Sequence, residues 1–233
     1  MDISEKTLQL KQDFDDVYEA GKKSQYDEFW DNYQLNGNRT NYTFAFCGAG
    51  WTKDNLKPKY KVVPSNASQG GSQMFDRCNM GGSEPIDFSL IADKFDFSNI
   101  EYGYNLFYSA KIENIIADLS KATNLGGAFT NSWGVYNTQN ITIKVNENVT
   151  MTNTFNALIE NLFFMEGSAI GKSITVNSKV LTKESILSIV GHLTDTASGQ
   201  TVTLSKTAKT KAFTDSEWAT LIAAKPNWTF SLV

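Results

Sequence analysis

Apolar residues near the start of the chain recur at the spacing of one helix face. Their loose three- and four-residue spacing predicts a helical segment over residues 1–36, with a weak coiled-coil seam. An aromatic stripe that begins at Tyr26 falls at positions i, i+3, i+4 and i+7 of a second helical stretch. Gly37 ends the segment, because glycine adopts the left-handed C-cap conformation at little cost. The candidate residues for docking or oligomerisation on this helix are Leu10, Phe14 and Val17.

This pattern disappears between residues 37 and 72. Glycine, asparagine and serine punctuate the stretch, which has neither helical nor strand periodicity. Segments of this kind usually lie on the surface and join modules. We therefore interpret residues 37–72 as an irregular junction.

From residue 73 the sequence repeats itself imperfectly around phenylalanines. The blocks QMFDRC, NLFYSA, GAFTNS and NTFNAL align on these residues, and three of the blocks lead into a short β-prone segment. The aligned residues are Phe75, Phe107, Phe129 and Phe155. Each unit is too short to bury its own apolar face, so the units must stack, with the phenylalanines as an interior spine. This pattern predicts a solenoid over residues 73–180.

The last part of the chain carries the clearest local signals. Thr182 is placed as the N-cap of an amphipathic helix, and residues 201–204 alternate as a strand does. The capping box that starts at Thr214 opens a second helix, and residues 228–232 alternate again. This order of helix, strand, helix and strand predicts an α/β cap over residues 181–233, which covers the last exposed core of the array.

Composition narrows the classes of function. With 41% apolar and 12% aromatic residues, the chain of 233 residues is long and apolar enough to fold around a core. Its net charge of −4 has the wrong sign for nucleic-acid binding through bulk positive charge. No apolar run approaches the roughly 20 residues that cross a bilayer, and the acidic first residues lack the apolar region of a secretory signal. We therefore expect neither membrane insertion nor a signal peptide.

Candidate catalytic and metal-binding groups are few. A single histidine, His192, and two cysteines exclude most protein-built zinc or copper sites. The stretch GSAIGKS at residues 167–173 misses the phosphate-binding loop by one residue between its glycines, and a strand-like segment follows where that loop requires a helix. Asp87, Asp93 and Asp96 are the candidate acids of a glycoside hydrolase, but no motif sets their separation. We therefore predict that the protein is not an enzyme and has no catalytic residue, metal or cofactor.

Aromatic and asparagine side chains on a rigid face suit sugar recognition, by ring stacking and by amide hydrogen bonds. The candidate receptor-binding residues are Trp51, Tyr102, Tyr104, Trp133 and Tyr136. The alternative is that most of these rings pack inside the spine or the cap. The two alternatives differ in the exposure of the rings.

Several stretches resemble known families. Residues 73–176 resemble BspA-type leucine-rich repeats, whose units carry a central phenylalanine, a small residue or cysteine three positions later, and an apolar strand. The helix motif at residues 17–31, the junction NGNRTNYTFAFCGAGW at residues 36–51 and the ending from Leu181 resemble tail-associated proteins of phages that infect Firmicutes. The chain departs from the repeat family in its uneven spacing, and the family's asparagine–cysteine pair survives only in part, near Cys78.

The local patterns and the resemblance together predict an α+β fold. It consists of an N-terminal helix, a short irregular BspA-like leucine-rich-repeat solenoid and an α/β C-terminal cap. The resemblance implies a non-enzymatic virion-associated protein, a tail adhesin or a decoration, that presents its repeats to a host-surface glycan or protein. Its N-terminal helix would bind other virion proteins, and a homo-oligomer formed through this helix stays open.

The absent secretory signal favours a virion protein made in the host cytoplasm. That origin argues against a disulfide between Cys47 and Cys78, whose separation the sequence leaves open. A purely structural virion protein and a bacterial cell-surface leucine-rich-repeat adhesin are the alternatives.

Overall fold

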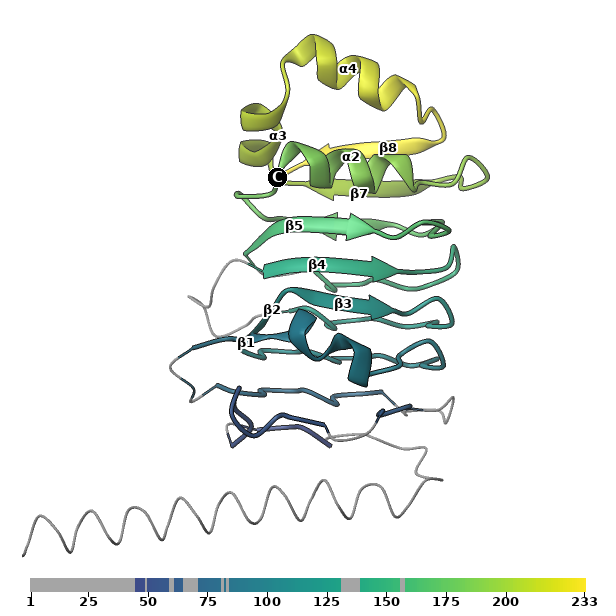
Figure 1. The fold of residues 1–233 in the computed structure, drawn as a ribbon. Helices are drawn as coiled ribbons and strands as arrows, with labels where there is room; N and C mark the ends of the chain where they lie inside the picture. Colours follow the sequence, from purple (N-terminus) through teal and green to yellow (C-terminus); the bar gives the residue numbers. More distant parts are fainter. Residues whose placement is uncertain are drawn as a thin grey trace, which may run out of the picture.

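The structure is a computed structural model of the chain, and only part of the chain is described. The described residues are 45–48, 50–58, 61–64, 71–80, 82, 84–130, 139–155 and 158–233. The helix predicted over residues 1–36, with its candidate docking residues, lies outside the described residues. The described segments follow one another in chain order along one axis (Figure 1).

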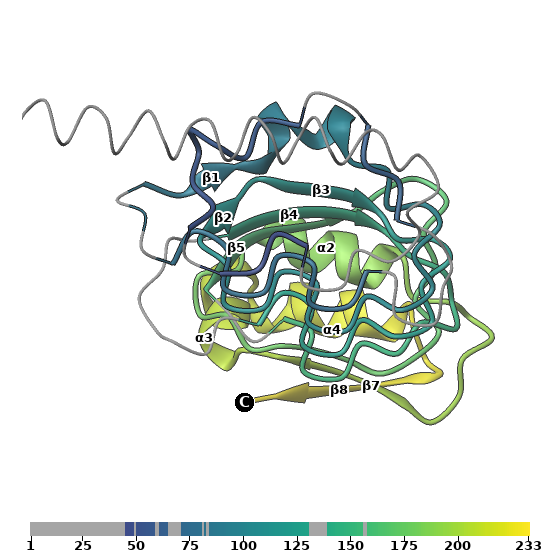
Figure 2. The ribbon, with the colours of Figure 1, turned by 90° about the horizontal axis from the view of Figure 1, so that it is seen from below.

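Short parallel strands make up three small sheets. The first sheet pairs β1 (Ile86–Asp87) with β2 (Ile112–Glu113). The second has the order β3 (Ile115–Asp118), β4 (Gln139–Lys144) and β5 (Ile159–Phe164). The third has the order β6 (Ile174–Val176), β7 (Gln200–Leu204) and β8 (Trp228–Leu232). Figure 2 shows β7 and β8 along one side of the molecule and β3, β4 and β5 along the opposite side.

Helices in the described part of the chain are short. Two 3-10 helices, η1 (Phe88–Leu90) and η2 (Ala92–Lys94), lie between β1 and β2. The three α-helices are α2 (Lys183–Gly191), α3 (Lys206–Ala212) and α4 (Asp215–Ala223). All three therefore belong to the last quarter of the sequence.

The predicted fold, a leucine-rich-repeat solenoid behind an N-terminal helix and below an α/β cap, is wrong. Strands of the described residues divide among three small parallel sheets instead of one continuous repeat sheet. The physical reason lies in the unequal units, because the four aligned phenylalanines are 32, 22 and 26 positions apart. Units of different length cannot all supply a strand of equal length at the same place, so pairing between some segments shrinks to single bridges.

The interior phenylalanine stack that the alignment predicted is confirmed. Neighbouring ring centroids of Phe75, Phe107, Phe129 and Phe155 are 4.9, 5.7 and 5.8 Å apart, and the ring planes are within 15° of parallel. All four side chains are buried. The backbone repeats with the rings: the N–H of Phe75 donates to the carbonyl of Leu106 at 2.8 Å, and the next phenylalanines make the same contact one unit further on.

The stack has a further member that the alignment missed. The ring of Phe46 stacks on Phe75 at 5.1 Å, and its N–H donates to the carbonyl of Met74 at 2.8 Å. Gly48 has a φ of 103° two positions after Phe46, and Arg77 has a φ of 56° two positions after Phe75. The stretch interpreted as an irregular junction thus contributes a turn of the same kind as the repeats.

An amide ladder joins the second sheet to α2. The side-chain amide of Asn140 donates to the oxygen of Asn114 at 2.9 Å, and that of Asn161 donates to the oxygen of Asn140 at 2.8 Å. The Thr182 hydroxyl continues the ladder to the oxygen of Asn161 at 3.1 Å. Because the Asn140 amide both donates and accepts, the ladder ties β4 to Asn161 of β5 and to Asn114, which directly precedes β3.

The local signals of the last part of the chain are confirmed. The Thr182 hydroxyl accepts the N–H of Ser185 and caps α2. Thr214 and Glu217 form the capping box of α4 in both directions, at 3.2 and 2.7 Å. The alternating segments are the strands β7 and β8. These motifs could be found from the sequence because their partners are three residues apart.

Candidate binding face

The strands of the third sheet carry hydroxyl groups at alternate positions. We call the outward residues of one strand a row and the paired residues of neighbouring strands a column. Thr175 of β6 pairs with Thr203 of β7, which pairs with Ser231 of β8. Two residues earlier in β7 and β8, Thr201 pairs with Thr229. The intervening Ile174 and Val202 are buried. Since alternate residues of a strand point to the same side, the hydroxyl-bearing residues form two outward columns.

Single bridges extend the first column, which holds Ser173, Thr201 and Thr229, toward the start of the chain. The second column, which holds Thr175, Thr203 and Ser231, is interrupted at Gly126. Met151 pairs with Ile174, Thr150 pairs with Asn124, and Asn124 pairs with Tyr102. We call this surface the hydroxyl face. Its members are Tyr102, Tyr104, Asn124, Thr150, Thr152, Ser173, Thr175, Thr201, Thr203, Thr229 and Ser231. All of its side chains are polar without charge, or tyrosine.

Two of the predicted receptor-binding aromatic residues lie together at one end of the hydroxyl face. The ring centroids of Tyr102 and Tyr104 are 6.3 Å apart, with an angle of 33° between the planes, and Tyr104 is 43% exposed. A Cβ atom at Gly126 would lie 3.4 Å from the Tyr104 ring, so this glycine lets the ring pack against the neighbouring segment. The Asn124 side chain accepts the N–H of Gly126 at 2.8 Å and holds that segment in place.

The other predicted aromatic residues do not join this pair within the described structure. Trp51 is buried, and its ring meets the ring of Phe46, the first member of the phenylalanine stack, edge-on at 5.3 Å. Trp133 and Tyr136 lie outside the described residues, as do Leu10, Phe14 and Val17. Trp51 therefore belongs to the core.

The candidate catalytic groups are engaged in local structure. Asp87 and Asp96 each accept the N–H and the hydroxyl of the serine two residues later, and Asp96 also pairs with Lys61 at 3.3 Å. A hydrogen bond of 2.7 Å joins the His192 Nδ1 atom to the carbonyl of Ser188. In the described part of the chain, no group of three or more His, Cys, Asp or Glu side chains is placed to hold a metal ion.

The two cysteines are free thiols near the phenylalanine stack. Burial raises the pKa of the Cys78 thiol, and electrostatic interaction with Cys47 adds to the shift. Burial also raises the pKa of Cys47, and the Asp76 carboxylate raises it further. Both thiols are therefore disfavoured as thiolates.

The stretch at residues 167–173 does not form a phosphate-binding loop. It leads into strand β6 instead of the N-terminus of a helix, as the sequence indicated. A Cβ atom at Gly171 would lie 2.5 Å from the backbone oxygen of Glu147, so this glycine serves the close approach of two loops. Its neighbour Lys172 borders a cavity beside the hydroxyl face.

Comparison with known proteins identifies no relative. No protein-family model, curated protein or solved structure matches this chain. Among the described residues, no helix combines the length and the apolar character that crossing a membrane requires. The resemblance to phage tail-associated proteins therefore stays a prediction from the sequence.

The columns of the hydroxyl face were missed in the sequence, although they leave a recurring signal. Each of four rows consists of a hydroxyl residue, a residue with an apolar side chain and a second hydroxyl residue. These triplets are Thr150–Thr152, Ser173–Thr175, Thr201–Thr203 and Thr229–Ser231. A single triplet is only an alternating strand, and the surface exists because the pairing places the triplets side by side.

Proposed function

We propose that this protein binds an uncharged polysaccharide of the host surface through the hydroxyl face, as a non-enzymatic component of a phage virion. The observation that carries the proposal is the pair of hydroxyl columns, which ends at the Tyr102–Tyr104 pair. Hydroxyl groups donate and accept hydrogen bonds equally well, as do the hydroxyls of a sugar. The lack of charged side chains in the columns favours a ligand without charge.

The spacing of the columns favours a ligand that is itself repetitive. Neighbouring rows of a parallel sheet lie about 4.8 Å apart, and alternate residues of one strand lie about 6.6 Å apart. A polysaccharide presents hydroxyl groups at regular intervals, so it can use several rows at once. The exposed ring of Tyr104, beside Tyr102, supplies an apolar surface for the face of a sugar ring.

The virion location is supported by the resemblance of the helix motif, the junction and the ending to phage tail-associated proteins. In this proposal the segment over residues 1–36 binds other virion proteins, and the hydroxyl face is turned toward the host. Peptide mass spectrometry of purified, nuclease-treated particles tests this part. The chain should be present in several copies, whereas its restriction to host envelopes would favour a bacterial surface adhesin.

The binding part is tested by charge insertion with a matched control. Thr203 lies half-buried in the middle strand of the third sheet, and Thr142 lies half-buried in the middle strand of the second sheet on the opposite side. Thr203→Lys should abolish retention of the full chain on host envelope polysaccharide, while Thr142→Lys should leave it unchanged. Equal retention of both variants would refute the hydroxyl face as the binding surface. Failure of the unaltered protein to bind, with unstable particles in its absence, would favour a structural virion protein.

A further inference from the structure

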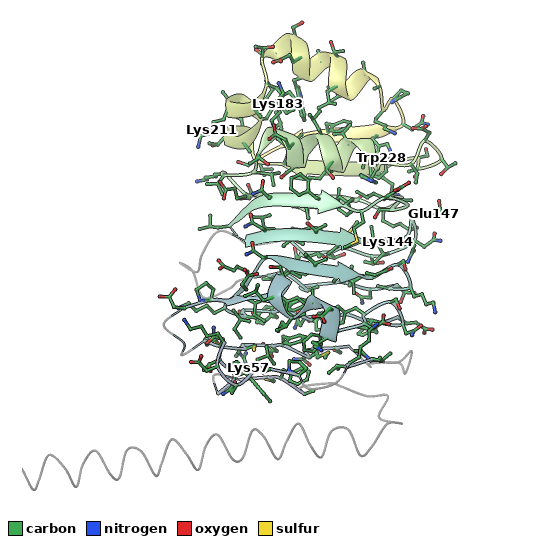
Figure 3. All side chains as sticks on the ribbon, in the orientation of Figure 1. Lys57, Lys144, Glu147, Lys183, Lys211 and Trp228 are labelled. Carbon is green, nitrogen blue, oxygen red and sulfur yellow. The ribbon has the colours of Figure 1, made fainter. Side chains whose placement is uncertain are left out.

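A polar cavity of about 300 Å³ opens beside the hydroxyl face. Three loops line it: the loop after β4, the loop before β6 and the loop before β7. Polar side chains on these loops border it, including Glu147, Asn148, Lys172, Thr194, Ser198 and Gln200. Figure 3 shows Glu147 at the edge of the molecule, on the side where β8 begins at Trp228. The volume is at the lower end of that of small-molecule sites.

The loops that form the cavity are held together by backbone contacts. The N–H of Gly171 donates to the carbonyl of Glu147 at 3.1 Å, which sets the Lys172 loop against the Glu147 loop. The N–H of Thr194 donates to the carbonyl of Ile170 at 2.9 Å, and its carbonyl accepts the indole N–H of Trp228 at 2.8 Å. The cavity is therefore a preformed feature of the fold.

The cavity carries one charge of each sign. Glu147 and Lys172 are both exposed, and neither belongs to an ion pair in the described part of the chain. A hydroxyl can donate to the carboxylate and accept from the ammonium group, and such charge-assisted hydrogen bonds are the stronger ones. Because the two charges cancel, a ligand without net charge fits better than an ion of either sign.

The cavity is continuous with the hydroxyl face. The side-chain oxygen of Gln200 accepts the N–H and the hydroxyl of Ser173, at 2.8 and 3.0 Å. The Ser173 hydroxyl in turn accepts the N–H of Thr201 at 2.9 Å, within the first hydroxyl column. The cavity and the hydroxyl face therefore meet at the contact between Gln200 and Ser173.

We propose that this cavity binds one uncharged sugar unit, the terminal monosaccharide of the polysaccharide that lies on the hydroxyl face. The assignment of this sugar to the bound polysaccharide rests on the proposed function. Lys172 donates to one ring hydroxyl, and Glu147 accepts from another. The cavity thereby selects the end of the chain, whereas the hydroxyl face binds its repeating part.

The experiment uses the full chain and four free sugars, namely glucose, galactose, mannose and N-acetylglucosamine, in saturation-transfer NMR. At least one sugar should bind, and Glu147→Gln and Lys172→Gln should each weaken its binding at least tenfold. The matched controls are Glu166→Gln and Lys179→Gln, which neutralise exposed residues of the same types outside the cavity lining and should leave binding unchanged. Binding of none of the four sugars, or equal binding by cavity and control variants, would overturn the proposal.

The two proposals fail in different ways. Thr203→Lys should abolish polysaccharide retention while the free sugar still binds, because Thr203 does not line the cavity. Free-sugar binding that depends on Glu147 and Lys172, without retention on polysaccharide, would keep the cavity and overturn the proposed function. Retention on polysaccharide without any free-sugar binding would keep the proposed function and overturn the cavity proposal.

Discussion

The amide ladder through Asn140 allows one prediction to be worked from the geometry. Asn140→Ala removes two side-chain hydrogen bonds, of 2.9 and 2.8 Å, in the centre of the second sheet. Each bond contributes about 1 kcal/mol net, and the partner groups on Asn114 and Asn161 lose their bonding partners in a half-buried position. We expect the free energy of unfolding to fall by about 2–3 kcal/mol, a large part of the stability of an ordinary domain.

Urea denaturation of the full chain measures this loss. With a slope near 3 kcal/mol per molar urea, the midpoint should fall by roughly 0.7–1 M while the slope stays the same. Asn177→Ala is the control, because Asn177 is exposed just after β6, and its effect should stay within about 0.5 kcal/mol. A loss below that limit for Asn140→Ala would refute the view that the ladder holds the sheet.

Asn140→Asp separates hydrogen bonding from side-chain size. The carboxylate keeps an acceptor for Asn161 but has no donor for Asn114, so the variant should be destabilised at neutral pH. Protonation restores the donor, which raises the pKa of the new carboxyl in the folded state above its unfolded value. The defect should therefore be relieved as the pH falls through the folded pKa, and it should be complete above that pKa. A defect that is independent of pH would contradict this account.

Three further predictions concern other parts of the fold. Phe107→Ala, in the middle of the phenylalanine stack, should cost about 3–5 kcal/mol in urea denaturation, because the ring is buried between Phe75 and Phe129. Hydrogen bonding to Thr214 and pairing with Lys183 lower the pKa of Glu217 to about 2. The stabilising effect of Glu217 should therefore be present above its unfolded pKa and vanish as pH falls through about 2. Glu217→Gln should remove this part of the pH dependence of the melting temperature. Cys78 should resist a thiol reagent at neutral pH in the native protein and react on unfolding, because burial raises its pKa; rapid native labelling would contradict its burial.

In the proposed function, the hydroxyl face and the cavity divide recognition between them. The two columns would bind weakly at each row, so their affinity would depend on how many rows a ligand spans. In the proposal, the open cavity adds one position with a carboxylate and an ammonium group, which would favour a defined sugar over its neighbours. We therefore propose that the protein distinguishes polysaccharides by both their repeat and their end.

Local motifs could be read directly from the order of residues. The caps at Thr182 and Thr214 depend on partners three residues away, so the sequence contains the whole interaction. The phenylalanine spine was also predictable, because a large apolar ring at recurring positions must be buried against another such ring. These features depend on contacts between residues close in the sequence or on the hydrophobic effect alone.

The division into three sheets, the place of Phe46, the amide ladder and the hydroxyl face required the tertiary structure. Each depends on the register between segments more than 20 residues apart, and a shift of one residue would turn every outward side chain inward. The unequal spacing of the phenylalanines conceals that register in the sequence. The order of residues therefore determined the burial of the four aligned phenylalanines and where α2 and α4 begin, and the pairing of distant segments decided which polar side chains share a surface.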